Sequence, residues 1–179
     1  QSVGLGGDSV VRVTDGELTI GPDRSGPALA YGGPEPTPTD ALFVLGKTGE
    51  GDQEKAESGI AAIAKELGLS TQQAAQKIFD ETCRQILGYA RQMVEKINSK
   101  PVYTVREALH GHRINPAHLL VLGGPTPQFA EHLESMSDYT VHMVPQWDVA
   151  NAIGTALSRT TCEVTLFADT YKLEASAPE

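Results

Sequence analysis

Cysteine, basic residues and long apolar runs are all scarce in this sequence of 179 residues. The two cysteines, Cys83 and Cys162, lie far apart, and a chain of this length can bury enough apolar surface without disulfides. We therefore expect a reduced, cytoplasmic setting. Acidic residues outnumber basic ones by 23 to 14, and the resulting net charge of -9 repels polyanions, which argues against nucleic acid as a partner. No apolar run reaches the length of a membrane span, so no membrane partner is expected.

The first half of the chain predicts a hairpin, then a long irregular loop. Ser9–Val13 and Glu17–Ile20 have strand character, and Asp15-Gly16 between them is a hairpin turn signal. The segment 21–38 is too rich in glycine and proline for regular structure. Composition leaves two interpretations open for it, a surface loop or an ordered loop that forms part of a site.

Three helices are expected next. Thr39 or Asp40 can cap a short helix that runs to Leu45, and Asp52 can cap a second that ends at Gly68. Ser70 begins a long third helix with one apolar face. Its apolar positions are Ala75, Ile78, Phe79, Cys83, Ile86, Leu87, Ala90, Met93, Val94 and Ile97.

The second half alternates strands and helices. First comes a fully buried strand at 119–122, which a glycine turn joins to a helix that runs to about Met136. A strand at 140–144, a helix at 147–158 and a strand at 162–167 follow, before a frayed tail at 169–179. The inward positions of the 147–158 helix are Val149, Ala152, Ile153 and Ala156. This order predicts an α/β fold with helices covering a sheet. We expect one domain over 1–179, with a helical portion at 47–100 and an α/β portion at 115–168.

Two glycine segments are candidate sites. Gly123-Gly124 ends the predicted buried strand, where ligands bind in α/β sheets and where a flat ligand meets no side chain. The alternative is a tight turn that needs glycine for its own dihedral angles. The segment 4–9 is either a flexible leader or a loop that lines a site with the carboxylate of Asp8.

The histidines give no clear metal site. His110 and His112 are two residues apart, but no third ligand is evident nearby, so we expect solvated loop histidines and no metal ligands. His132 is expected on an exposed helix face.

Several segments, in order, resemble the hydantoinase/oxoprolinase family. Residues 4–9 (GLGGDS) are similar to its glycine-rich segment, 15–22 to the hairpin that follows, and 36–41 (PTPTDA) to its Pro-Thr-x-Thr-Asp-Ala motif. Further matches are Ser25-Gly26-Pro27, 30–33 (AYGG), the strand and glycines at 120–125, Val144-Pro145 and 150–154 (ANAIG). Each motif is weak alone, but their order and spacing are specific, and they cover nearly the whole chain.

The resemblance implies the later part of an actin-like (ribonuclease-H-like) ATPase fold with a long-helix subdomain. Family members couple ATP hydrolysis to the opening of hydantoins or 5-oxoproline. Gly123, Gly124 and Thr126 would then form the adenosine side of the nucleotide cleft, and Asp8 and Asp40 are the catalytic candidates. Asp40 is also explained as a helix cap.

The resemblance also implies what other parts of the protein supply. A chain that opens at Gln1 on a glycine loop is expected to belong to a longer protein, whose N-terminal lobe provides the phosphate and Mg²⁺ ligands. The small-molecule substrate and a possible partner subunit follow from the family. Alone, this chain is expected to bind no nucleotide tightly and to be inactive.

One departure from the family pattern leaves other functions open. Pro125 and Pro127 follow the glycines here and remove N–H donors from the turn. The alternatives are an activator or reactivating-chaperone ATPase of the same superfamily, and an interaction module without catalysis.

Overall fold

A β-hairpin opens the computed structural model, which describes residues 3–99, 105, 109, 113–161 and 167–176. Strands β1 (Val11–Thr14) and β2 (Glu17–Ile20) pair antiparallel, with Val11 opposite Ile20. Between them Asp15 and Gly16 both have positive φ angles, 53° and 80°, which is the conformation that suits a two-residue hairpin turn. The predicted hairpin is confirmed.

The glycine- and proline-rich segment that follows is ordered. It contains the 3₁₀ helix η1 (Leu29–Tyr31), and the amide of Gly33 donates a hydrogen bond of 2.9 Å to the carbonyl oxygen of Ala28. A Cβ atom at Gly33 would lie 1.7 Å from the carbonyl oxygen of Pro27. This close backbone packing favours the ordered-loop interpretation over the loose surface loop.

The cap of helix α1 (Pro38–Val44) lies two residues before the nearer predicted cap. This cap is Thr37, whose side chain accepts from the amide of Asp40, while the Asp40 carboxyl group accepts from the amide of Thr37. The predicted cap at Thr39 or Asp40 is therefore wrong. Proline is favoured at the first helical position because its missing N–H has no partner there, so Pro38 moves the start of the helix forward.

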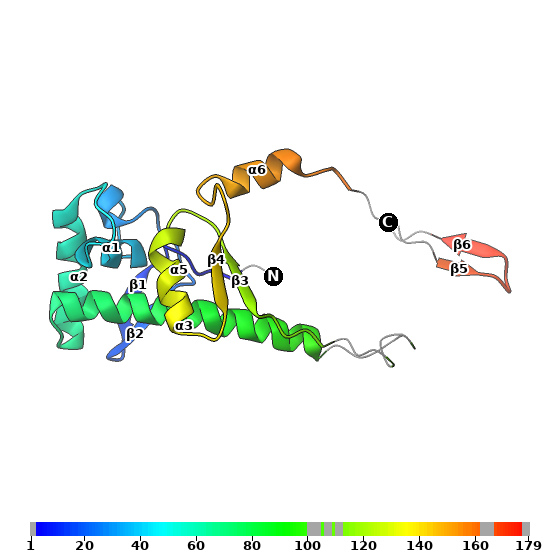
Figure 1. The fold of residues 1–179 in the computed structure, drawn as a ribbon, viewed down its shortest axis with the longest axis horizontal. Coiled ribbons are helices and arrows are strands. Elements are labelled where there is room, and N and C mark those ends of the chain that lie inside the picture. Colours follow the sequence, from blue (N-terminus) through cyan, green and yellow to red (C-terminus); the bar gives the residue numbers. More distant parts are fainter. Residues whose placement is uncertain (1–2, 100–104, 106–108, 110–112, 162–166, 177–179) are drawn as a thin grey trace.

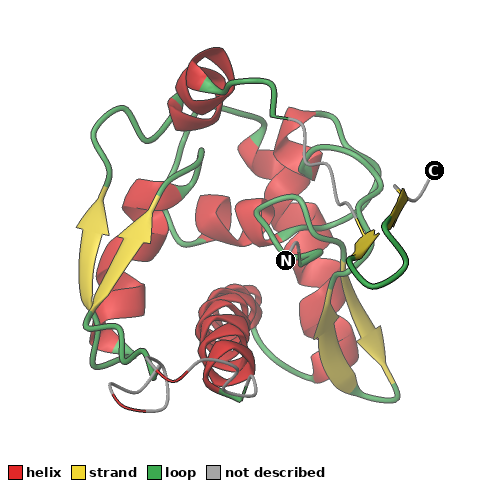
Figure 2. Ribbon diagram, turned by 90° about the vertical axis from the view of Figure 1, so that its right-hand side faces the viewer, coloured by secondary structure: helices red, strands yellow, loops and turns green. Residues whose placement is uncertain are grey.

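Helices α2 (Gln53–Leu67) and α3 (Thr71–Asn98) start and stop where the sequence predicts. Asp52 caps α2, Gly68 ends it with a φ angle of 66°, and Ser70 forms a capping box with Gln73 at the start of α3. Helices α1, α2 and α3 pack against each other and form the main core with the hairpin (Figures 1 and 2). This core contains Val11, Ile20, Ala41, Ile60, Ile63, Ala64, Ala74, Ala75 and Ile78.

The apolar face of α3 is only partly used. Phe79, Cys83 and Leu87 are buried, whereas Met93 and Ile97 in the last turns are 40% and 37% exposed. The predicted stripe of one buried face is correct for the first part of the helix and wrong for these two positions, because the elements that pack on α3 do not reach that far (Figure 1).

Strands β3 (His118–Val121) and β4 (Thr140–Met143) form a parallel pair beside the middle of α3. Figure 2 shows them on the opposite side of α3 from the hairpin. Helix α5 (Thr126–Ser135) covers one face of the pair, where Leu119 and Val121 pack against Phe129 and Leu133. The other face is open, with Leu120 66% exposed, so the predicted full burial of this strand is wrong.

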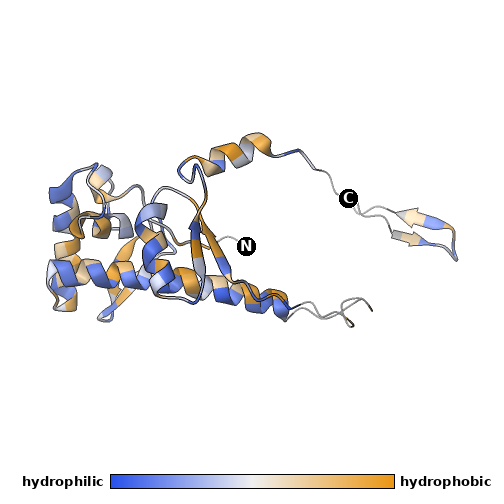
Figure 3. Ribbon diagram, in the orientation of Figure 1, coloured by the Kyte–Doolittle hydropathy of each residue, from blue (hydrophilic) through white to orange (hydrophobic). Residues whose placement is uncertain are grey.

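The last elements extend away from the main body. Helix α6 (Ala150–Leu157) is apolar but buries no residue, and Val149 just before it is 47% exposed (Figure 3). The predicted inward face of this helix, which includes Ala152, Ile153 and Ala156, is therefore wrong. An apolar stripe shows that a helix has one face to bury, but it does not identify what covers that face.

The end of the chain differs from the predicted strand and tail. Strand β6 (Glu174–Ser176) lies inside the segment that we expected to fray, and it pairs antiparallel with β5 (Phe167–Asp169), whose last residue is the first of that segment. The predicted strand at 162–167 lies outside the described residues except for Phe167. The described residues therefore contain three separate two-stranded sheets instead of the one helix-covered sheet that we expected.

The mixed α/β class is confirmed, while the actin-like assignment and the single-domain division stay predictions. Within the described ranges, no helix combines the length and apolarity needed to cross a bilayer. The arrangement places the start of α1, the segment before β1 and the start of α5 near one another, and the candidate site lies there (Figure 1).

Candidate functional site

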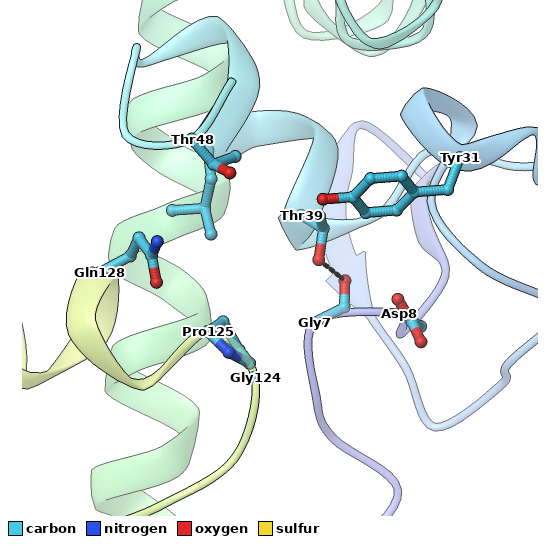
Figure 4. Close-up of a pocket in the computed structure, with 9 residues that line it drawn as sticks. Gly7, Asp8, Tyr31, Thr39, Thr48, Gly124, Pro125 and Gln128 are labelled. Atoms are coloured by element: carbon cyan, nitrogen blue, oxygen red, sulfur yellow. Dashed lines mark hydrogen bonds between the residues drawn. The ribbon is translucent and has the colours of Figure 1, made fainter. Parts of the chain in front are cut away.

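A pocket of about 400 Å³ lies between two separate parts of the chain (Figure 4). One wall comes from the N-terminal segment, η1 and α1, and the other from the β3–α5 turn and the first turn of α5. Its lining residues are Gly7, Asp8, Tyr31, Thr39, Leu42, Thr48, Gly124, Pro125 and Gln128. Sites for small molecules have volumes of roughly 300–1,000 Å³, so this pocket is large enough for one.

The N-terminal wall is fixed by hydrogen bonds to the start of α1. The hydroxyl and the amide of Thr39 both donate to the carbonyl oxygen of Gly7, at 2.8 and 3.0 Å. Gly6 donates its amide to the hydroxyl of Ser9 at 2.8 Å. A Cβ atom at Gly7 would lie 2.7 Å from the Thr39 hydroxyl, so glycine allows this close approach. The segment 4–9 is thus an ordered wall and not a flexible leader.

Asp8 lies in this wall, as expected for a site-lining carboxylate. Its side chain is 31% exposed and accepts a 2.5 Å hydrogen bond from Arg24. The structure brings Asp8 and Gly124, which are far apart in sequence, into one pocket (Figure 4). A catalytic role for Asp8 stays a prediction.

Asp40 occupies a different kind of position. Its side chain is buried, and its two oxygens accept four hydrogen bonds, from the amides of Leu29, Ala30 and Thr37 and from the Thr37 hydroxyl, at 2.9–3.1 Å. It does not line the pocket. This geometry ties η1 to α1 and makes Asp40 the capping-box partner of Thr37 rather than the cap itself, while the catalytic prediction for Asp40 is not tested.

The two glycines after β3 differ in their surroundings. Gly123 has a φ angle of 114° and donates its amide to the carbonyl oxygen of Trp147 at 2.9 Å, so it serves the turn itself. Gly124 is exposed and lines the pocket, and a Cβ atom there would meet no atom within 4 Å. Gly124 therefore leaves open space where a flat ligand can approach the backbone.

Thr126, the third predicted cofactor residue, is not among the pocket-lining residues. It is buried at the first position of α5, and its amide donates to the carbonyl oxygen of Gly123 at 3.1 Å. The structure thus joins Gly124 with Asp8 and leaves Gly123 and Thr126 as supports of the turn. Direct nucleotide contact by any of the three stays a prediction.

Two further pocket residues were not predicted. Tyr31 is 51% exposed, and its ring meets Phe43 edge-on with 5.7 Å between ring centres. The sequence analysis noted Tyr31 only as part of the 30–33 motif. The signal that could have identified it is an aromatic residue within a glycine-rich loop. Gln128 carried no sequence signal, because its importance comes from the pocket that forms around it.

The loop that carries Tyr31 is also held by charged groups. Arg12 on β1 makes ion pairs with Asp23 and Glu35, at 2.7 and 3.1 Å. A hydrogen bond from Ser25, followed by one from Arg12, holds the pKa of Glu35 below its usual value. These contacts join the two ends of the loop to the hairpin.

Cys83 and the described histidines, His118, His132 and His142, lie outside the pocket lining. Burial, with a smaller contribution from nearby Asp80, raises the pKa of the Cys83 thiol to about 12, which makes it a poor nucleophile. His132 is not on an exposed helix face as predicted. Its Nε2 lies 2.7 Å from Asp80, and its ring stacks on Phe79.

No metal cluster is evident among the described residues, where no group of three or more His, Cys, Asp or Glu side chains converges. His118 and His142 form an unpredicted pair on the open face of the β3–β4 sheet, with 2.9 Å between ring nitrogens. His110 and His112 lie outside the described residues.

The family model described as hydantoinase/oxoprolinase matches residues 1–164, which is most of the chain. No curated protein matches it.

Proposed function

The chain belongs to the hydantoinase/oxoprolinase family, and from this premise we propose that it forms the adenosine side of the nucleotide cleft in an ATP-dependent hydrolase of cyclic amides. The observation that carries the proposal is that Gly124 lies open in a pocket opposite Asp8. In this proposal the fold is the later part of an actin-like ATPase.

The pocket residues fit an adenosine group. The bare backbone at Gly124 allows a planar base to lie against it, and the exposed ring of Tyr31 offers an aromatic face in the same pocket. Gly124 precedes the N-terminus of α5, but the first turn of this helix adds no free amide to the pocket, because Pro125 and Pro127 have no N–H and the amides of Thr126 and Gln128 donate to Gly123 and Pro125.

The proposal divides the work between this chain and the rest of the full-length protein. When bound, ATP supplies the free energy for opening the amide ring, and a second lobe supplies the phosphate and Mg²⁺ ligands. Asp8 is the candidate for holding or moving a proton at its carboxylate, and its pairing with Arg24 fixes that carboxylate at the pocket wall.

A ring-opening assay of the full-length protein tests this proposal. We expect hydantoin or 5-oxoproline to be opened with one ADP formed per ring, and we expect the 179-residue chain alone to release no phosphate. Ring opening that is independent of ATP, or phosphate release by the chain alone, would contradict the proposal.

A variant of Gly124 makes this test specific to the pocket. Gly124→Val places a side chain in open space, so we expect it to fold normally but to weaken ATP binding at least tenfold. Gly154→Val on α6, where a Cβ atom also meets nothing within 4 Å, is the matched control. Equal ATP affinity of both variants would place the nucleotide elsewhere.

A second candidate function is an activator or reactivating-chaperone ATPase of the same superfamily. The two prolines in the turn favour it, because they leave fewer donors for nucleotide contacts. ATP turnover that appears only with a partner protein, without ring opening, would support this function.

A further inference from the structure

Gln128 presents an unpaired polar atom at the pocket. Its side-chain oxygen Oε1 is buried and, within the described ranges, has no hydrogen-bond partner. Its amide nitrogen Nε2 lies 3.5 Å from the carbonyl oxygen of Lys47. Buried polar groups are almost always paired in folded proteins, so an unpaired acceptor in a pocket wall calls for an explanation.

The contact with Lys47 fixes which end of the amide faces which way. A carbonyl oxygen only accepts hydrogen bonds, so the nitrogen of Gln128 must be the end that faces Lys47. The oxygen is then the end without a partner, and it can only accept. Gln128 lies in the first turn of α5, and that helix is held on α3 by the Phe79–Phe129 ring contact at 5.1 Å.

Other polar groups of the pocket do not supply the missing donor. Pro125 beside it has no amide hydrogen, and the hydroxyl of Thr39 already donates to the carbonyl oxygen of Gly7. A ligand that carries a hydrogen-bond donor would satisfy this oxygen, provided that a small turn of the Gln128 side chain exposes it to the pocket.

We propose that Gln128 selects adenine by accepting a hydrogen bond from the amino group of the base. This inference rests on the proposed function, because it requires the base to lie against Gly124 in this pocket. Hypoxanthine and guanine carry a carbonyl oxygen in place of that amino group. Two acceptors then face each other, and both lose their hydrogen bonds to water without a replacement.

The alternative is that Gln128 only lines the pocket wall and that its amide contributes nothing to ligand choice. Binding measurements on the full-length protein separate the two possibilities, with ADP and inosine diphosphate as probes. We expect the wild type to bind ADP roughly tenfold or more tightly than inosine diphosphate, the effect of about one hydrogen bond.

Two variants of Gln128 report on the accepting oxygen. Gln128→Met keeps the length of the side chain but removes the acceptor, so we expect ADP affinity to fall roughly tenfold while the affinity for inosine diphosphate stays unchanged. Gln128→Glu keeps an accepting oxygen but loses the amide nitrogen that faces Lys47, so we expect it to retain the preference for ADP with a lower affinity for both nucleotides. Gln85→Met, on α3 and outside the pocket lining, is the control and is expected to change neither affinity.

The outcomes distinguish this inference from the function on which it rests. Equal binding of ADP and inosine diphosphate by the wild type, or an unchanged preference in Gln128→Met, would overturn the role of Gln128 and leave the nucleotide site intact. Failure of both nucleotides to bind the full-length wild type would overturn the proposed function, and this inference with it.

Discussion

Replacing Asp40 by alanine is expected to lower the free energy of unfolding by several kcal/mol, because this side chain holds η1 against α1. Its removal leaves the amides of Leu29, Ala30 and Thr37 without their acceptor. An unpaired buried donor costs about 1–3 kcal/mol. Leu29 is only half-buried, so its amide regains water, and we expect a total of roughly 3–5 kcal/mol.

Asparagine at the same position is expected to be milder. Three of the four hydrogen bonds reach one oxygen of Asp40, and the amide oxygen of asparagine can take over that place. The new NH₂ group then faces the amide of Ala30, and one hydrogen bond is lost. We expect Asp40→Asn to cost about 1–3 kcal/mol, less than Asp40→Ala.

Urea unfolding followed by circular dichroism measures these changes. Asp52→Ala is the control for loss of a simple helix cap, with one hydrogen bond to the amide of Lys55 at 3.1 Å and an expected cost of about 1 kcal/mol. Asp8→Ala is expected to reduce ring opening by the full-length protein while leaving stability nearly unchanged. If Asp40→Ala instead abolished ring opening with a stability loss below about 1 kcal/mol, Asp40 would be catalytic and our reasoning wrong.

Two further predictions concern burial and backbone packing. With Cys162 replaced by serine, Cys83 is expected to react with a thiol reagent at pH 8 only after unfolding. Because folding raises the pKa of the Cys83 thiol from 9.0 to about 12, this thiol ionises above pH 9 in the unfolded chain but not in the folded one. The contribution of Cys83 to stability therefore falls as the pH rises from 9 to 12. Fast reaction of the folded protein would contradict this burial. Gly33→Ala is expected to destabilise the protein by about 3 kcal/mol, because the new Cβ atom meets the Pro27 carbonyl oxygen, whereas Gly6→Ala points into open space and is expected to be near neutral in thermal unfolding. Similar melting temperatures for the two glycine variants would show that the loop yields easily.

Local features of the fold were predictable because neighbouring residues determine them. The Asp15-Gly16 turn, the Ser70 capping box and the Gly68 stop each depend on a few adjacent side chains and dihedral angles. The start of α1 was missed although Pro38 signalled it, because the Thr-Asp pair after the proline looked like a cap of equal quality.

Features that depend on tertiary contacts were not predictable in the same way. The run at 119–122 is apolar throughout, but apolar character does not reveal that only one face of β3 is covered. Asp80 and His132 are 52 positions apart, and no spacing rule connects them. For the site, glycine content identified Gly124, and a motif suggested Asp8, whereas Gln128 becomes notable only once Lys47 lies beside it.

The long helix α3 links the two walls of the pocket. Its residue Ile78 packs in the core with Ala41 of α1, while the next residue, Phe79, contacts Phe129 of α5. The side chains of Ile78 and Phe79 therefore help to set the distance between the two walls of the pocket, although neither residue lines it. A change in the volume of the Phe79 side chain would alter ligand affinity without changing any residue that lines the pocket. Selection for tighter binding can therefore act on the interior of the protein as readily as on its surface.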